Sequence, residues 1–244
     1  MHNETLNSSR AAATEFAHGI SNFWERRLGR HLIGFYLIGS LAHGGFSARY
    51  SDIDVAVIAE EPLTPEDLAL MSERASALSN ELAPKLSLFW TDRQFSTGRF
   101  PPLDRVDLID HGIAVLERKH VRPLRPSLDE IRTYLGAQPL QNWSRQAEIL
   151  SSLTELTAAN HKAYLRTLLY PARFAYSWMT GAMGSNDEAV AWLHSHAADR
   201  LDVDLIERAL HCRNKNLDPD HLFPERSKLH LYRDACLRLA AAHP

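Results

Sequence analysis

The sequence predicts an α+β protein with two domains, an N-terminal α/β domain with a mixed sheet and a C-terminal bundle of helices. Short apolar runs alternate with helical patterns as far as residue 119. Residues 121–130 contain two prolines and are typical of a linker, and helical patterns dominate from residue 127 onward. The chain has 244 residues, 45% of them hydrophobic, which is enough for two modest cores. We therefore assign the domains to residues 1–119 and 127–244.

The N-terminal domain is expected to alternate helices with three strands. The run at 32–39 is apolar and ends in Gly, as a buried strand that enters a turn does. A short helix should follow that turn, and a second strand should cover 52–59. The segment 64–83 carries helix start signals, with Thr64 as N-cap and Pro65 at the first helical position. The remaining elements are a first helix at 11–29 and a third strand at 85–92.

Composition and charge exclude several classes of partner. The net charge is −3 and no block of Lys and Arg exceeds a few residues, so we expect no polynucleotide partner. No apolar run approaches the ~18 residues that span a bilayer, and the N-terminal segment lacks the pattern of a secretion signal. Cys212 and Cys236 have no zinc-type spacing. We expect a cytoplasmic protein that contacts no membrane, and we favour a monomer.

Two aspartates alternate at the start of the second strand, within "YLIGSLAHGGFSARYSDIDVAVI" at residues 36–58. Side chains two apart on a strand share a face, so Asp52 and Asp54 present their carboxylates together while Ile53 and Val55 face the other way. Ionised carboxylates this close repel each other unless a cation lies between them, and oxygen-rich sites suit Mg²⁺. The pattern predicts a Mg²⁺ site.

A turn at Gly39-Ser40 precedes these aspartates. It follows a strand and should open a helix, where free backbone N–H groups can hold phosphate oxygens. Gly44 and Gly45 allow the chain to approach a ligand closely. On spacing alone, ordinary turns are an equally good interpretation. His43, inside this stretch, is expected to be a solvent-facing loop residue.

Together these motifs resemble the signature of the polymerase-β-like nucleotidyltransferase superfamily, which here reads Gly39-Ser40, Gly44-Gly45 and Ser51-Asp52-Ile53-Asp54. The resemblance implies that Gly39, Ser40 and Ser51 bind the nucleotide triphosphate. It also implies that Asp52 and Asp54 hold Mg²⁺ ions, which activate the acceptor hydroxyl and neutralise the leaving pyrophosphate.

The helical half carries a narrower resemblance. Residues 171–210 are similar to the helical domain of the streptomycin/spectinomycin adenylyltransferases, where an Arg-aromatic helix ends in Thr-Gly and a helix with an Ala…Ala-Trp pattern follows. The similarity covers roughly residues 30–235. It implies transfer of AMP from ATP to a hydroxyl of a small molecule, with an aminoglycoside antibiotic as acceptor and antibiotic resistance as the role. It further implies that residues of both domains line the site.

The third strand departs from this family at one position. The family carries an acid there that helps to bind metal or acts as general base, and we align Ser87 with it. A serine hydroxyl is neither a strong Mg²⁺ ligand nor a base near neutral pH. Asp92 is the nearest acid; it replaces the missing group only if the strand ends or bulges before it, and is otherwise a turn residue. Asp104 and Asp107 are more distant candidates, in a surface segment that leads to a helix.

Basic side chains form a stripe on the long helix of the second half. Lys162, Arg166 and Arg173 fall within about 40° on a helical wheel. Facing the nucleotide they would bind its triphosphate, and facing water they would form a solvated surface. Pro171 lies between the last two and weakens their alignment if it kinks the helix.

Two acids in "GSNDEAVAW" also have two interpretations. Asp187 and Glu188 could bind a cationic substrate. They could equally stabilise the start of a helix, because Ser185 and Glu188 have the spacing of a capping box.

The leading prediction is therefore a Mg²⁺-dependent nucleotidyltransferase that moves AMP from ATP to a small-molecule hydroxyl. The alternative is a nucleotide-binding protein of the same fold that lacks the third carboxylate and has lost efficient transfer. A third possibility is an enzyme that modifies a protein or an RNA end. The sequence names neither the acceptor nor the nucleotide base.

Overall fold

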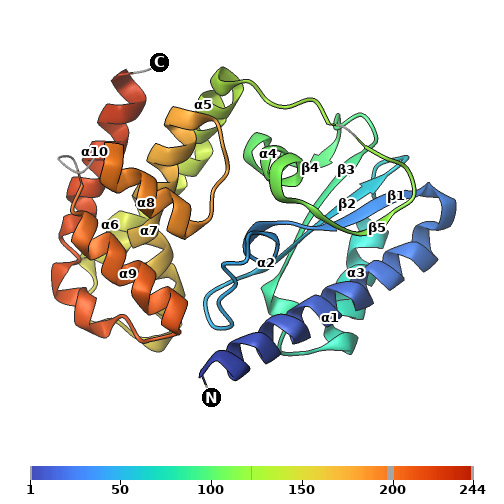
Figure 1. Ribbon diagram of the computed structural model, residues 1–244, viewed down its shortest axis with the longest axis horizontal. Coiled ribbons are helices and arrows are strands. Elements are labelled where there is room, and N and C mark those ends of the chain that lie inside the picture. Colours follow the sequence, from blue (N-terminus) through green and yellow to red (C-terminus); the bar gives the residue numbers. More distant parts are fainter. Residues whose placement is uncertain (1, 122, 197–200, 243–244) are drawn as a thin grey trace. The chain divides into compact units, whose positions relative to one another are not determined.

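The computed structural model describes residues 2–121, 123–196 and 201–242. Its internal contacts divide the chain into two compact units, Met1–Arg125 and Pro126–Pro244. The first unit combines a sheet with helices, and the regular elements described in the second are helices (Figure 1). The predicted α+β class is thus confirmed. None of the helices in these ranges has both the length and the apolarity needed to cross a bilayer.

The sheet of the first unit has five strands in the order β4-β3-β2-β1-β5. The strands β2 and β3 run parallel and the other pairs are antiparallel, so the sheet is mixed, as predicted. The three predicted strands are present, and the two edge strands β4 and β5 were not predicted. The bounds are β1 Leu32–Leu37, β2 Ile53–Ala59, β3 Leu86–Asp92, β4 Gly98–Arg99 and β5 Ile113–Glu117.

Helices cover both faces of this sheet (Figure 1). On one face Ile53, Val55 and Val57 pack into a core with Phe16, Ile20 and Trp24 of α1 and Met71 of α3. On the other face a smaller cluster joins Ala56, Ile58 and Phe89 to Leu108 of α4. The helices are α1 His2–Leu28, α2 Gly39–His43, α3 Pro65–Leu78 and α4 Pro102–His111, with short 3₁₀ turns at Gly29–His31 and Ala83–Lys85. The side chain of Asp54 alternates with those of the first core, so it belongs to the second face.

The start of α3 forms as its sequence predicts. Thr64 is the N-cap, Pro65 stands at the first helical position, and Thr64 and Asp67 form a capping box. Arg27 at the end of α1 donates to the Asp67 carboxylate at 2.7 Å, which ties the two helices together. The helix ends at Leu78, earlier than expected, because Ser79 has an extended backbone.

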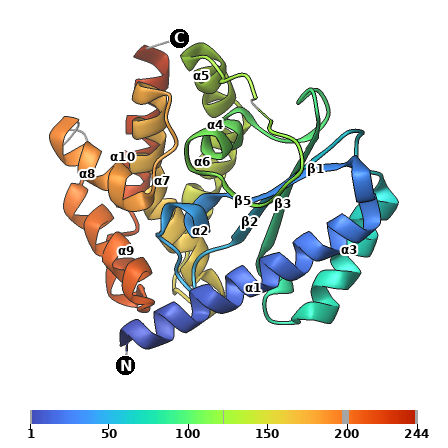
Figure 2. The same cartoon turned by 45° about the vertical axis from the view of Figure 1, so that its right-hand side comes forward.

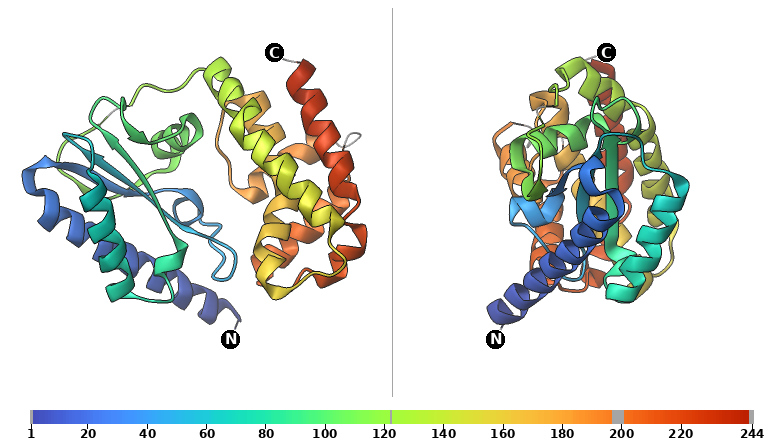
Figure 3. Two further views of the ribbon diagram at one scale, coloured as in Figure 1. Left: turned by 180° about the vertical axis from the view of Figure 1, so that it is seen from behind. Right: turned by 90° about the vertical axis from the view of Figure 1, so that its right-hand side faces the viewer.

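The second unit is built around α7, which packs against five other helices (Figures 2 and 3). Twelve of its 20 residues are buried. The bounds are α5 Leu128–Gly136, α6 Gln138–Ser152, α7 His161–Thr180, α8 Asn186–His196, α9 Val203–Lys215 and α10 Lys228–Ala242, with 3₁₀ turns at Ala158–Asn160 and Asp220–Glu225.

A proline lies inside α7, yet the helix continues through it. Pro171 has no N–H, so the carbonyl of Thr167 four residues earlier loses its helical donor. The indole N–H of Trp143 in α6 donates to that carbonyl at 3.0 Å. The same indole stacks on Tyr170, with ring centroids 4.8 Å apart. A neighbouring helix thus replaces the hydrogen bond that the proline removes.

Replacing Trp143 by Phe should therefore destabilise the protein. The change keeps an aromatic ring but leaves a buried carbonyl without a donor, which costs about 1–3 kcal/mol. Trp178→Phe is the matched control, because Trp178 is buried in the same unit and its indole nitrogen has no hydrogen-bond partner among the described residues. Urea unfolding of both variants measures the difference. Equal losses would show that the hydrogen bond to Thr167 contributes nothing.

Candidate functional site

The two alternating aspartates stand where β2 begins. Asp52 immediately precedes the strand and Asp54 is its second residue, and both are half-buried. Their neighbours Ile53 and Val55 are fully buried against α1 and α3. The predicted separation of acidic and apolar residues to opposite faces is therefore present, and the two carboxylates belong to the face opposite α1 and α3.

Gly39 begins α2 in close contact with Asp54. Its φ is +62°, a left-handed conformation that favours glycine. A Cβ at this position would lie 2.4 Å from Oδ2 of Asp54, so any side chain here would collide with the carboxylate. The backbone N–H of Ile38 also donates to the Asp54 carbonyl at 3.1 Å. These contacts fix the turn beside the aspartate pair.

The backbone N–H of Gly39 is already occupied, which corrects one expectation. It donates to Oδ2 of Asp107 at 2.7 Å, so it is not free for a phosphate oxygen. Asp107 is 1% exposed and lies in α4, rather than in a surface segment that precedes a helix. The buried hydroxyl of Ser40, in contrast, has no hydrogen-bond partner among the described residues. The Ser40 hydroxyl is therefore a buried polar group of this turn whose hydrogen bond a ligand could supply.

His43 is also placed differently from the expectation. It is the last residue of α2, its side chain is largely buried, and its Nε2 lies 2.5 Å from Oδ1 of Asp107. Gly44 follows with a left-handed backbone and caps the helix. The carboxylate of Asp107 thus joins both ends of α2, Gly39 through one oxygen and His43 through the other.

Ser87 lies directly beside Asp54. The two strands are parallel, and their register pairs Asp54 with Ser87 and Ala59 with Asp92. Ser87 is half-buried, and the strand continues without interruption to Asp92. The position that the resemblance assigns to an acid is therefore next to the aspartate pair, and it holds a hydroxyl.

Asp92 forms a turn at the far end of the same strand. Its carboxylate accepts hydrogen bonds from the hydroxyls of Ser96 at 2.5 Å and Thr97 at 3.1 Å, and from the Ser96 amide at 2.9 Å. Burial is the largest single influence on its pKa and raises it, but these hydrogen bonds together outweigh burial and lower the pKa. The strand does not bulge to bring Asp92 back to the aspartate pair.

Ser51 organises the loop before the aspartates. Its hydroxyl accepts the amide N–H of Ser47 at 2.9 Å, and its own amide donates to the Ser47 carbonyl at 2.9 Å. Lys85 donates to the Ala48 carbonyl in the same loop at 2.6 Å. Ser51 is buried and sets the conformation from which Asp52 projects.

The carboxylates of Asp52 and Asp54 suit Mg²⁺. Carboxylate oxygens are hard ligands, and Mg²⁺ completes such sites with water and phosphate oxygens. Larger clusters of acidic and imidazole ligands in the described residues are His43–Asp107–His111 and His161–Asp218–Asp220, and neither includes Asp52 or Asp54. A Mg²⁺ ion at the aspartate pair would therefore depend on the nucleotide for further ligands.

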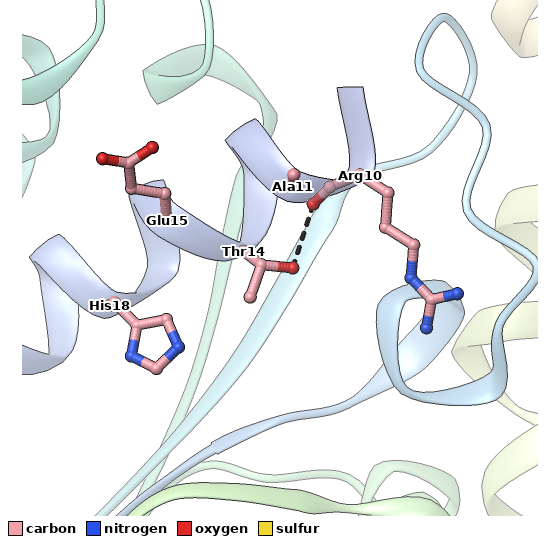
Figure 4. A pocket seen from close by; sticks show the side chains of 5 residues that line it. All are labelled: Arg10, Ala11, Thr14, Glu15 and His18. Carbon is pink, nitrogen blue, oxygen red and sulfur yellow. Dashed lines mark hydrogen bonds between the residues drawn. The ribbon is translucent and has the colours of Figure 1, made fainter. Parts of the chain in front are cut away.

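A shallow depression on α1 is lined by Arg10, Ala11, Thr14, Glu15 and His18 (Figure 4). All five residues belong to one helix, and neither Gly39 nor Asp54 is among them. The side chain of Arg10 extends away from α1 and donates to the carbonyl of Leu41 in α2 at 3.2 Å. Arg10 therefore braces α2, and the depression is separate from the aspartate pair.

The three predicted cations of the second unit lie on α7. Arg166 is exposed, and Lys162 and Arg173 are half-buried. A further cation, Arg213 of α9, is 8% exposed and was not predicted. Burial first, and then the positive charge of Arg173, lower the pKa of the Arg213 guanidinium, while Asp187 opposes them. The packing of α9 on α7 brings Arg213 near Arg173, and such a long-range contact leaves no local pattern in a sequence.

The two predicted acids begin α8. Glu188 and Ser185 form the capping box, with the Ser185 N–H donating to the Glu188 carboxylate at 2.7 Å and the Glu188 N–H to the Ser185 hydroxyl at 3.1 Å. Asp187 accepts from the side-chain amide of Asn214 in α9 at 2.9 Å. Both carboxylates thus have structural roles, and their contact with a substrate stays a prediction.

No protein-family model matches the chain, and no curated protein sequence does. Among solved structures it is similar to a crystal structure of spectinomycin adenyltransferase AAD(9) from Enterococcus faecialis with ATP and spectinomycin. The identity is 14%, the TM-score is 0.64, and the match covers 93% of this chain and 99% of that one. The chain therefore shares the fold of that structure, and in this chain a mixed sheet with helices is followed by a helical part.

Proposed function

We propose that this protein is a nucleotidyltransferase that moves AMP from ATP to a hydroxyl group of a small molecule. The observation that carries the proposal is the contact between Gly39 and Asp54 at the start of β2. The contact joins the turn that carries Ser40 to Asp54, and Asp52 lies two residues before Asp54. A metal held by such carboxylates would stabilise the charge of a transferring nucleotide. The solved structure of similar fold supports ATP as co-substrate and an aminoglycoside-type antibiotic as acceptor, because that protein was crystallised with ATP and spectinomycin.

Each group has a proposed role in the transfer. Asp52 and Asp54 hold Mg²⁺, which when bound neutralises charge on the triphosphate. The Ser40 hydroxyl donates to a phosphate oxygen, and Ser51 fixes the loop that carries Asp52. The acceptor oxygen forms a bond to the α-phosphorus of ATP while the bond to the pyrophosphate oxygen breaks. With Ser87 beside Asp54, the hydroxyl proton passes to water or to an amine of the substrate.

A second candidate function is a nucleotide-binding protein that no longer transfers AMP efficiently. The pairing of Asp54 with Ser87 favours it, because no carboxylate stands at the position of the general base. This candidate keeps the roles of Ser40, Asp52 and Asp54 in binding Mg·ATP, and it differs from the first only in the rate of transfer.

Two measurements separate these functions. Isothermal titration with ATP and Mg²⁺ tests binding, and a pyrophosphate-release screen over spectinomycin, streptomycin and other hydroxylated amines tests transfer. Binding with release supports the enzyme, and binding without release supports the nucleotide-binding protein. Absence of Mg²⁺-dependent ATP binding would contradict both.

The basic stripe on α7 is also proposed to bind the triphosphate. The double variant Lys162→Ala/Arg166→Ala should then bind ATP more weakly, by about 1.5–3 kcal/mol for each charge-assisted hydrogen bond lost. Arg145→Ala is the control, because Arg145 is exposed in the same unit and donates to nearby Asn142. Calorimetry measures both. Unchanged affinity in the double variant would assign Lys162 and Arg166 to a solvated surface.

A further inference from the structure

Two histidines and an aspartate meet at the end of α2. Asp107 and His111 are four residues apart on α4, so they project from one face of that helix. His43, the last residue of α2, reaches the same place. One ligand atom from each of the three side chains lies within 4.8 Å of the other two. The two imidazole rings are in contact, with centroids 4.4 Å apart.

The side chains of this cluster are largely buried, and a hydrogen bond orients its carboxylate. The side chains of His43 and Asp107 are 6% and 2% exposed, and that of His111 is half-buried. Oδ2 of Asp107 accepts the Gly39 N–H at 2.7 Å, which leaves Oδ1 facing Nε2 of His43. A backbone hydrogen bond therefore orients the carboxylate from behind, as outer hydrogen bonds do for metal ligands.

We propose that His43, Asp107 and His111 bind a divalent transition metal of the Zn²⁺ type, with water as the fourth ligand. Three protein ligands and a water make up a common tetrahedral zinc site. Imidazole nitrogens suit Zn²⁺, whereas Mg²⁺ prefers oxygen ligands, so this site is chemically distinct from the aspartate pair. The proposal uses no property of the nucleotide and does not depend on the proposed function.

The distances are compatible with a metal after small rotations of the side chains. Bonds of about 2.0–2.2 Å in a tetrahedral site place ligand atoms about 3.4 Å apart. This value lies between the 2.5 Å that now separates Nε2 of His43 from Oδ1 of Asp107 and the 4.8 Å limit of the cluster. Binding would replace that hydrogen bond with two metal bonds. The metal would hold the end of α2 against α4, and α2 begins at the Gly39-Ser40 turn.

The test uses the untagged full chain after treatment with a chelator. Equilibrium dialysis against Zn²⁺, followed by metal analysis, should give one tightly bound ion per chain. His111→Ala should weaken binding at least about 10- to 100-fold, the loss that even outer-sphere changes produce. Co²⁺ offers a second readout, because its visible spectrum in the parent should show a tetrahedral site with nitrogen ligands. This spectrum is recorded on the parent protein, so the test does not depend on whether a variant folds.

Two control variants localise the ion. His161→Ala removes the other cluster of potential ligands, His161–Asp218–Asp220, and should retain the ion. Asp52→Asn/Asp54→Asn removes the proposed Mg²⁺ ligands and should also retain it. The proposal is overturned if the parent binds no Zn²⁺, if His111→Ala binds it as tightly as the parent, or if His161→Ala loses it instead.

Discussion

The double variant Asp52→Asn/Asp54→Asn is expected to lose AMP transfer and Mg²⁺-dependent ATP binding while it keeps its fold. Asparagine has nearly the shape of aspartate, so the contact between residue 54 and Gly39 is preserved, as is the hydrogen bond from Ile38 to the backbone carbonyl of residue 54. What disappears is the pair of negative charges. A metal ion contributes several kcal/mol to the transition state, so the rate should fall at least about 10³-fold.

Calorimetric titration with Mg·ATP and single-turnover assays measure the two losses. Glu73→Gln is the matched control, because it removes a carboxylate charge from the exposed side of α3 in the same unit. That variant should bind and react like the parent. Undiminished binding of Mg·ATP by the double variant would exclude Asp52 and Asp54 as metal ligands.

Local patterns were sufficient to predict the part of the fold that carries the aspartate pair. The apolar runs of β1, β2 and β3 are buried on both faces or nearly so, and such strands are visible in a sequence. The two unpredicted strands lie at the sheet edges. β4 has two residues and β5 is half-exposed, so backbone pairing rather than side-chain burial defines them. That pairing leaves little trace in a sequence.

In the site, too, features that depend on neighbouring residues could be predicted, and contacts between distant parts of the chain could not. Asp52, Asp54 and Gly39 could be identified because alternation along a strand and a turn are local features. Asp107 could be predicted only as a distant candidate for the missing acid, because its contacts with Gly39 and His43 span more than 60 residues of the chain. The polar segment around Asp107 predicts a surface position, whereas the carboxylate is buried and is paired there with the Gly39 N–H and the His43 imidazole.

The register between β2 and β3 makes the missing acid testable. Ser87 pairs with Asp54, so a carboxylate introduced at position 87 would lie beside the aspartate pair. Ser87→Glu should increase the rate of AMP transfer about 10²- to 10⁴-fold, the usual contribution of a positioned general base. Glu accepts a proton only when it is ionised, so the rate of the variant should rise with pH through the pKa of the new carboxyl and then level off.

Single-turnover assays at saturating Mg·ATP measure this effect across a range of pH. Ser87→Gln is the control, because its side chain has the same length as that of Glu but cannot accept the proton. The increase should be confined to Ser87→Glu, because only its side chain is a base. If the parent already reacts at ordinary rates and Ser87→Glu is inert or harmful, the proton acceptor lies elsewhere. Asp92 is then a weak candidate, because it lies five residues beyond Ser87. Its carboxylate also accepts hydrogen bonds from Ser96 and Thr97. In that case the substrate's own amine is the group to examine, by comparing acceptors with and without one.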